Sequence, residues 1–529
     1  MSVPSPDVLT QPAAAAASPR VVTARRALLA AAGLGVLADP LLRNGPAGLG
    51  LPVWMAVFAV VLLALLRHLD RPIPDETRAW LSVAMVFAGG QAWRDSDMLH
   101  GFNFLAMLAA LVLVAMSLNA IPVPRLALAR VRDLIRAAFG TGLDVAFGMP
   151  QLLINDTEFH TVVPPATGVR RLSRAVVITV PVLLIFTVLL ADADPIFGSL
   201  FTLPDLDFEL LFSHVVVAGV FTWVVGGWLR RSLHAGPADT STAGHPFPLT
   251  LSTTDLALAL GALNLLFATF VVVQIGWLFG GEALVLRTTG LSYAEYARRG
   301  FFELACVASL LLPVLLGAHA LLPESDARAH RLYRRLALGA TVLLGAIMAS
   351  AFARMGLYVR YYGLSTDRLF ATAFMIWLVF VFAWLALTVL RARPRRFALG
   401  MVTSGFLVLV ALNIMNPDAL VARANLARSD SAHTGATGAD LRYLASLGGD
   451  AVPLLVSALT SSEAASHFAI EDRCKASDQL LKHWLGTHGP RMQQWTQWNL
   501  AKQRATAAVQ MHAMELRRIA CAPTPARVR

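Results

Sequence analysis

The most constraining feature of this sequence is a series of apolar runs separated by short polar connections. A helix needs roughly 20 mainly apolar residues to cross a bilayer, and its backbone groups must find their hydrogen bonds within the segment. The runs therefore predict an all-α, polytopic transmembrane bundle of about eleven spans. The expected spans are residues 27–42, 51–69, 78–94, 98–121, 172–194, 208–229, 255–280, 301–322, 333–353, 369–390 and 397–415.

Composition excludes a soluble globular protein. Hydrophobic residues make up 56% of the chain, charged residues only 15%, and the mean hydropathy is +0.61. The net charge of +11 comes from arginines that lie in short connections between apolar runs, so it indicates membrane topology and not nucleic-acid binding. We therefore expect the lipid bilayer as the partner and no nucleic acid. The near-absence of lysine and the abundance of alanine indicate a bacterial source.

The arginines also predict an orientation. Alternate connections are arginine-rich, for example around Arg67 to Arg78 and Arg391 to Arg396, and cytoplasmic loops are expected to be rich in Lys and Arg. The N-terminus is then cytoplasmic, and eleven crossings place the C-terminus outside an inner membrane. The expected regions are a disordered cytoplasmic tail (1–26), spans one to four (27–121), a cytoplasmic loop (122–171), spans five to eleven (172–415) and an extracytoplasmic helical domain (416–529).

The cytoplasmic loop contains one expected helix. Apolar residues recur at helical spacing from Val131 to Ala138, opposite arginines between Arg130 and Arg136. A basic amphipathic helix of this kind is typical of segments that lie on an anionic leaflet.

The C-terminal region carries a candidate disulfide. Cys474 and Cys521 both lie in it, whereas Cys306 lies in an apolar run. An extracytoplasmic location permits a disulfide between the first two. Closing a loop of that length would contribute about 4 kcal/mol in the chain-entropy model.

Charged side chains at the expected outer ends of the spans suggest a binding site. Glu303 is carried into an apolar run, where a carboxylate is costly unless it is paired, and Arg354 is its most plausible partner. Tyrosines and arginines also prefer the headgroup zone, so interfacial anchoring is the alternative for these residues. The candidates for an outward-facing polar vestibule are Glu303, Arg354, Tyr358, Tyr361, Arg368 and Arg298.

No motif of a soluble enzyme is present. The sequence contains no Walker loop, no HExxH and no dinucleotide fingerprint after a strand, so we expect no cofactor and no metal site. Asn264 and Gln274 lie ten residues apart on one expected span. Two interpretations stay open for them, hydrogen bonding between helices and the lining of a pathway.

Several separated motifs resemble one family. They are ADADPIF at 191–197, YAEYARRGFFEL at 293–304, RMGLYVRYYGLSTDRLFA at 354–371, NPDALVARANLAR at 416–428 and DLRYLASLGGDAVPLL at 440–455. Together they are similar to bacterial multi-pass membrane proteins grouped as a domain of unknown function, DUF4153/DUF4173-like. The resemblance covers about residues 150 to 510 and implies no established activity.

Two functions remain open. The first is a non-catalytic role in transport, sensing or envelope maintenance, with an envelope protein or a small molecule as the ligand. The second is a membrane-embedded transferase similar to the lipid-linked glycosyltransferases, in which Asp192 with Asp194, or Asp95 with Asp97, act as outward acids. The sequence does not decide whether the protein is an enzyme.

Overall fold

The structure is a computed structural model that describes residues 19–119, 130–157, 208–234, 252–289, 301–323, 326–391, 393–429, 440–461, 468–486 and 494–521, together with residues 179, 183 and 190. Within these ranges the regular secondary structure is helical and no strand occurs. The predicted all-α polytopic bundle is confirmed.

The first part of the bundle, called here the N-terminal half, has one hydrophobic core. Its buried residues include Met55, Phe58, Leu66 and Phe87. The helices that contribute to this core are α1 (Pro19–Leu42), α2 (Gly50–His68), α3 (Asp75–Trp93), α4 (Asp97–Leu118) and α9 (Phe208–His234), joined by α5 (Val131–Gln151), which runs into a π-helical turn (Leu152–Asp156).

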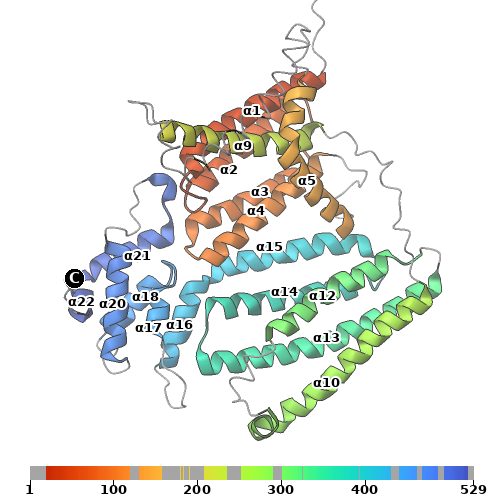
Figure 1. Cartoon of the computed structure of the whole chain (residues 1–529), viewed down its shortest axis with the longest axis vertical. Helices are drawn as coiled ribbons and strands as arrows, with labels where there is room; N and C mark the ends of the chain where they lie inside the picture. The colour runs from red at the N-terminus through yellow and green to blue at the C-terminus, as the bar shows by residue number, and fades with distance from the viewer. Residues whose placement is uncertain are drawn as a thin grey trace, which may run out of the picture.

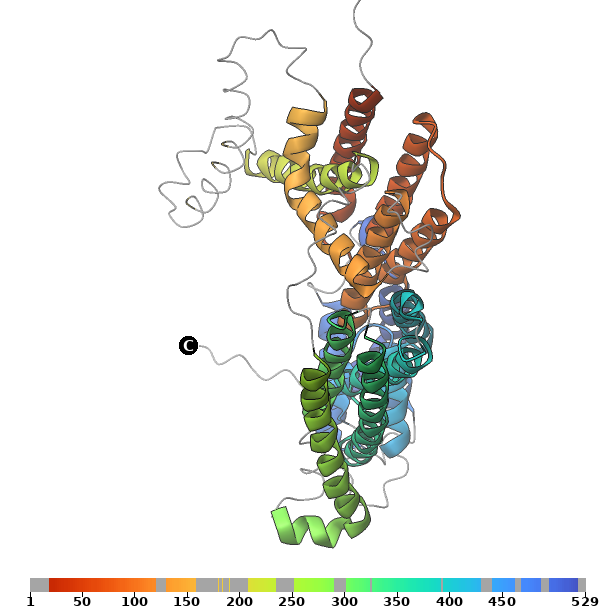
Figure 2. The same cartoon turned by 90° about the vertical axis from the view of Figure 1, so that its right-hand side faces the viewer.

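The second part, the C-terminal half, has a separate core that includes Tyr333, Leu344 and Met375. Its helices are α10 (Thr253–Thr289), α12 (Phe301–Ala320), α13 (Ala327–Tyr362), α14 (Thr366–Thr388) and α15 (Phe397–Met415). The N-terminal half lies above these helices in Figure 2.

Helix α15 connects the two halves. Phe397 at its start belongs to the core of the C-terminal half, whereas Phe406 and Leu409 pack against the core of the N-terminal half. Near its end, the side-chain amides of Asn413 and Asn103 of α4 form a reciprocal pair, with N–O distances of 2.8 and 3.0 Å. Buried amides need such partners, so this pair aligns α15 with α4.

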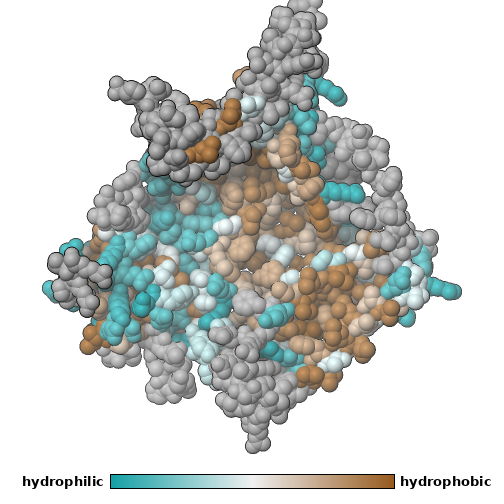
Figure 3. All heavy atoms as spheres, viewed as in Figure 1, coloured by the Kyte–Doolittle hydropathy of each residue, from teal (hydrophilic) through white to brown (hydrophobic). Residues whose placement is uncertain are grey.

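The described helices account for most of the predicted spans. Nine of them are long and apolar enough to cross a membrane. The third predicted span is helix α3, which is 19 residues long but does not belong to these nine, and the fifth, 172–194, lies almost entirely outside the described residues. The middle of the molecule is largely brown in Figure 3, as lipid-facing helices require.

The chain ends in a small helical domain with a third core, called here the C-terminal domain (Figure 1). Buried Val452, Leu455, Leu480 and Trp484 form the centre of this core. Its helices are α16 (Pro417–Ser429), α17 (Leu441–Ala445), α18 (Val452–Thr460), α20 (Ile470–Leu485), α21 (Leu500–Met511) and α22 (Ala513–Ile519).

Cys474 on α20 and Cys521 after α22 form a disulfide, with a Cα–Cα distance of 4.9 Å. The bond fastens the last helices of the chain to the centre of the C-terminal domain. Cys306 on α12 is a free and exposed thiol.

We expect Cys474→Ser combined with Cys521→Ser to lower the free energy of unfolding of the C-terminal domain by about 4 kcal/mol, because the bond closes a loop of 47 residues. Thermal unfolding of the full chain in lipid nanodiscs, followed by tryptophan fluorescence, measures the change. The control Cys306→Ser should leave the midpoint unchanged. An unchanged midpoint in the double variant would contradict a stabilising disulfide.

Candidate functional site

The C-terminal domain contacts the connections at one end of the bundle (Figure 1). These connections are called here the docking face and comprise residues 43–49, 94–96, 363–366 and 413–416. They come from both halves of the bundle. The ends of the spans opposite this face are called the distal ends.

At the first connection, between α1 and α2, the two backbones come very close. Gly48 has a φ of +111°, and a Cβ at this position would lie 2.7 Å from the carbonyl oxygen of Thr496. A side chain is therefore excluded by both conformation and space. Beside it, Asn44 Nδ2 donates to Gln494 Oε1 at 2.6 Å.

The second connection, between α3 and α4, holds a buried ion pair. Arg94 Nη1 lies 3.1 Å from Asp450 Oδ1, and the two side chains are only 9% and 6% exposed. Arg94 Nε also donates to the carbonyl of Asn413 at 2.7 Å, and Asn416 Nδ2 donates to Asp450 Oδ1 at 2.8 Å. Each charged group thus has the additional hydrogen bonds that a buried charge requires.

The backbones on the two sides of this ion pair are also joined. Asp95 N donates to Asp450 Oδ2 at 3.0 Å, and Gly449 N donates to Asp95 Oδ2 at 2.8 Å. A Cβ on Gly448 would lie 1.5 Å from the carbonyl oxygen of Asp95. Because the chains meet this closely, glycine is the only residue that fits at position 448.

Asn499 adds a further bond from the C-terminal domain to the same connection. Its Nδ2 donates to the carbonyl oxygens of Gln91 and Arg94, at 2.9 and 2.7 Å. Its Oδ1 accepts from the backbone N–H of Ala501 and Lys502 and so caps α21. A single buried side chain therefore fixes both the start of α21 and the end of α3.

Asp418 completes a central ion cluster, defined as Arg94, Asp95, Asp418, Asp450 and Lys502. Lys502 Nζ lies 3.5 Å from Asp95 Oδ1. Asp418 accepts from Gly448 N at 3.2 Å and from Ser96 Oγ at 3.4 Å. Burial, followed by the nearby carboxylates Asp450 and Asp95, raises the pKa of Asp418 to about 7. When Asp418 is neutral, two carboxylates balance two cations.

The third connection, between α13 and α14, is held from α16 and α17. Asn425 Oδ1 accepts from Leu364 N at 2.9 Å, and Asn425 Nδ2 donates to Leu364 O at 2.7 Å. Tyr443 Oη accepts from Thr366 N at 3.0 Å. The C-terminal domain thus bonds to the backbone of both halves of the bundle.

Several of the candidate site residues form contacts within the protein. Arg368 lies over the ring of Tyr358, 3.9 Å from its centroid, and donates to the carbonyl oxygens of Tyr362 and Gly363 at the end of α13. Tyr361 is 40% exposed, and its carbonyl oxygen accepts from Arg428. These contacts join Tyr358 and Arg368 to each other and to the end of α13. Arg298, Asp192 and Asp194 lie outside the described residues.

The expected pairing of Glu303 with Arg354 does not occur in the described part of the chain. Glu303 is exposed in the first turn of α12, whereas Arg354 Nη2 donates to Gln274 Oε1 of α10 at 2.8 Å. Ser350 Oγ donates to the same oxygen at 3.0 Å. The side chain of Arg354 points from α13 toward α10, so its guanidinium donates to the amide of Gln274 and not to the carboxylate of Glu303.

Of the two interpretations for the polar residues on α10, the structure shows the hydrogen bonding between helices. Gln274 joins α10 to α13 through Arg354 and Ser350, and Asn264 Nδ2 donates to the carbonyl oxygen of Leu336 on α13 at 3.0 Å. Among the described residues, no three His, Cys, Asp or Glu side chains are grouped to hold a metal ion.

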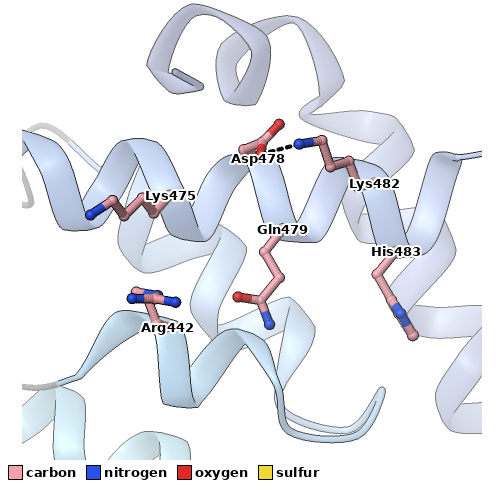
Figure 4. Close-up of a pocket in the computed structure, with 6 residues that line it drawn as sticks. All are labelled: Arg442, Lys475, Asp478, Gln479, Lys482 and His483. Atoms are coloured by element: carbon pink, nitrogen blue, oxygen red, sulfur yellow. Dashed lines mark hydrogen bonds and ion pairs between the residues drawn. The ribbon is translucent and has the colours of Figure 1, made fainter. Parts of the chain in front are cut away.

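The surface of the C-terminal domain has an open groove between α17 and α20 (Figure 4). Arg442 of α17 faces Lys475, Gln479 and His483 of α20 across it. Lys475 forms an ion pair with Glu471, and Lys482 pairs with Asp478 at 2.6 Å. The lining is rich in hydrogen-bond donors and cations, which suits an acidic ligand.

Sequence reasoning missed the central ion cluster. Arg94, Asp418 and Asp450 looked like ordinary residues at the ends of helices. The available signal was the sequence Gly448–Gly449–Asp450, in which two flexible residues precede an acid inside a motif with a family resemblance. Adjacent glycines indicate a close backbone approach, which the structure places against Asp95.

We expect Asp450→Ala to weaken docking by about 3 to 5 kcal/mol, because it leaves the guanidinium of Arg94 buried without its carboxylate. Arg94→Leu combined with Asp450→Leu should weaken docking less than Asp450→Ala does, since no charge is then left unpaired. Limited proteolysis of the full chain at the docking face measures the population of the undocked state. Asp478→Ala, which breaks an exposed ion pair, is the matched control and should change little.

Docking should also depend on pH through Asp418. Its docked pKa of about 7 exceeds the ordinary value of 3.8, so the docked state binds a proton more tightly than the undocked state. The contribution of Asp418 to the free energy of unfolding is therefore complete below about pH 4, and it is lost as the pH rises through about 7. Asp418→Asn should remove this dependence and raise the unfolding midpoint of the C-terminal domain at pH 8. A variant with the wild-type pH profile would argue against the raised pKa.

Residues 79–458 match the model of a family described as "Domain of unknown function (DUF4153)". No curated protein and no solved structure matches the chain.

Proposed function

Because the chain belongs to the DUF4153 family, whose members share a domain of unknown function, we propose its role from its own geometry: a non-catalytic membrane protein that senses through its C-terminal domain. In this proposal the C-terminal domain receives a signal outside the membrane. The docking face then transmits that signal to the helices of both halves.

One observation carries the proposal. The C-terminal domain bonds to the α3–α4 connection of the N-terminal half through Asp450 and Asn499, and to the α13–α14 connection of the C-terminal half through Asn425 and Tyr443. A change in the C-terminal domain would therefore alter the relative position of two groups of spans that have separate cores. Coupling of this kind needs a physical element that both sites contact.

The chemistry of the acids favours sensing over catalysis. Asp95, Asp418 and Asp450 all accept hydrogen bonds from protein groups, and Asp95 and Asp450 pair with the internal cations Lys502 and Arg94. Such fully partnered carboxylates stabilise an interface and are poorly placed to act as bases on a substrate. The transferase alternative would depend on Asp192 and Asp194, and its mark would be divalent-metal-dependent activity that Asp192→Asn abolishes.

The groove between α17 and α20 is our candidate for the receiving surface. Arg442 and Lys475 would meet an acidic small molecule or an acidic surface of an envelope protein. The exposed Glu303 and Tyr361 would then lie on the path of a ligand toward the docking face. In this proposal the remaining vestibule candidates line the same path; they are Arg298, Arg354, Tyr358 and Arg368.

The proposed location is a bacterial inner membrane with the N-terminus in the cytoplasm. Two observations support it. The C-terminal domain lies at the docking face, whereas the arginine-rich ends near Arg67, Arg230 and Arg393 are distal ends of spans. A disulfide in the C-terminal domain also fits an oxidising compartment outside the cytoplasm.

Double electron–electron resonance tests the coupling. Spin labels at Val36→Cys on α1 and Phe374→Cys on α14, in a Cys306→Ser background, report the separation of the two halves. Asn425→Ala combined with Tyr443→Phe removes the bonds of the C-terminal domain to Leu364 and Thr366 in the α13–α14 connection and leaves its bonds to the α3–α4 connection intact. We expect the distance distribution to broaden or shift by several ångströms, since α13 and α14 are then held less tightly by the domain.

Asp478→Ala changes the surface of the same domain without touching the docking face and serves as the control. A distribution that stays the same in the Asn425→Ala/Tyr443→Phe variant would reject the coupling. Solute flux in proteoliposomes that depends on Arg354 and Gln274 would instead favour transport.

A further inference from the structure

Helix α5 exposes a continuous apolar face and turns Asp144 toward the protein. Its exposed large residues are Ile135, Phe139, Leu143 and Phe147, spaced four apart and therefore on one face. Between them Ala138, Gly142 and Ala146 are also exposed, and Arg136 is the one charged residue among the exposed positions of this interval. We propose that α5 is embedded in the leaflet at the distal ends of the spans, with this face against lipid acyl chains.

The opposite face of α5 supports this arrangement. Asp144 pairs with Arg230 and Arg231 of α9, at 3.4 and 3.3 Å, and Asp156 pairs with Arg230 at 2.7 Å. These charges are turned toward the protein, where they have partners. A helix on an aqueous surface would show the reverse polarity.

Close packing holds α5 against the bundle. A Cβ on Gly227 of α9 would lie 2.2 Å from the carbonyl oxygen of Asp144, and a Cβ on Gly148 would lie 3.2 Å from the Cα of Gly227. Trp223 Nε1 of α9 donates to the carbonyl oxygen of Ala146 at 2.9 Å. Small residues at the crossing of two helices are typical of packing within a membrane.

The neighbours of α5 determine its depth. Trp223 lies ten residues, or roughly 15 Å, before Leu233 at the distal end of the α9 span. On the other side, Leu134 and Ala137 of α5 pack with Leu113 of α4, which is five residues from the distal end of that helix. Both contacts therefore lie within roughly 15 Å of the distal ends of the spans, which is half the thickness of a hydrocarbon core of roughly 30 Å.

Acyl chains fit this face better than a second copy of the chain does. The exposed face of α5 continues the lipid-facing surface of its neighbour α9, on which Val216, Val220 and Val224 are exposed. The surface over α5 is mostly brown in Figure 3, with hydrophilic atoms beside it. Exposed Arg136 lies next to the apolar face, where its long side chain can reach the headgroups.

An embedded α5 differs from the sequence expectation that this helix lies on the membrane surface. The sequence pattern grouped Val131, Leu134, Ile135 and Ala138 as one apolar face. In the structure, Val131 and Leu134 pack inward, whereas Ile135 begins the exposed face. The helix therefore uses apolar residues on both sides, as a membrane-embedded helix does.

Site-directed spin labelling tests the depth of α5. Single cysteines replace Ile135, Phe139, Leu143 and Phe147 in the Cys306→Ser chain, which keeps its disulfide. The labelled protein is reconstituted in vesicles of phosphatidylethanolamine and phosphatidylglycerol. We expect each label to collide readily with oxygen and about tenfold less with the water-soluble nickel chelate NiEDDA than a label at exposed Lys482 does.

Ala137→Cys, on the buried face, is the matched control and should be poorly accessible to both reagents. High NiEDDA accessibility at Phe139 and Leu143 would place α5 in water and overturn the proposal. Low accessibility to both reagents with dipolar broadening between labels would show that a second copy covers this face, which would also overturn it. Neither result depends on whether the C-terminal domain is a sensor.

Discussion

The buried ion pair between Arg94 and Asp450 is the interaction on which the arrangement of the three cores depends. It joins the end of α3 to the C-terminal domain, and the same two residues hold the end of α15 through Asn413 and Asn416. A buried pair of this kind adds little stability compared with apolar packing, but it is very intolerant of losing one partner. Its main effect is therefore to specify one way of docking.

The span pattern of the bundle could be predicted from the sequence, because length and apolar content alone decide what can cross a bilayer. The docking face could not. Arg94 and Asp450 are 356 residues apart, and nothing local distinguishes them from solvated residues at helix ends. The same limit explains Arg354: an apolar run fixes the position of a residue along a helix but not the direction in which its side chain points. Gln274, and not Glu303, therefore accepts its hydrogen bond.

The polar groups of the bundle show how this protein places charge near lipid. On α5 and α9, Asp144, Arg230 and Arg231 face each other, and on α10 and α13 the amide of Gln274 serves Ser350 and Arg354. In each case the polar atoms lie between helices and the apolar atoms point outward. The contacts of a helix, and not its sequence spacing alone, therefore distinguish a helix embedded in the membrane from one that lies on its surface.

The separation in sequence between the two sides of the docking face has a consequence for biosynthesis. Arg94 leaves the ribosome early, whereas Asp450 and Asn499 belong to the last part of the chain to be made. The guanidinium of Arg94 therefore has no carboxylate partner at position 450 while the eight predicted spans that follow it are made. Nascent chains that stop before residue 450 cannot form this ion pair. Assembly of the membrane part is thus finished only after the C-terminal domain has been made and has docked, so the last step of assembly depends on synthesis of residues near the end of the sequence.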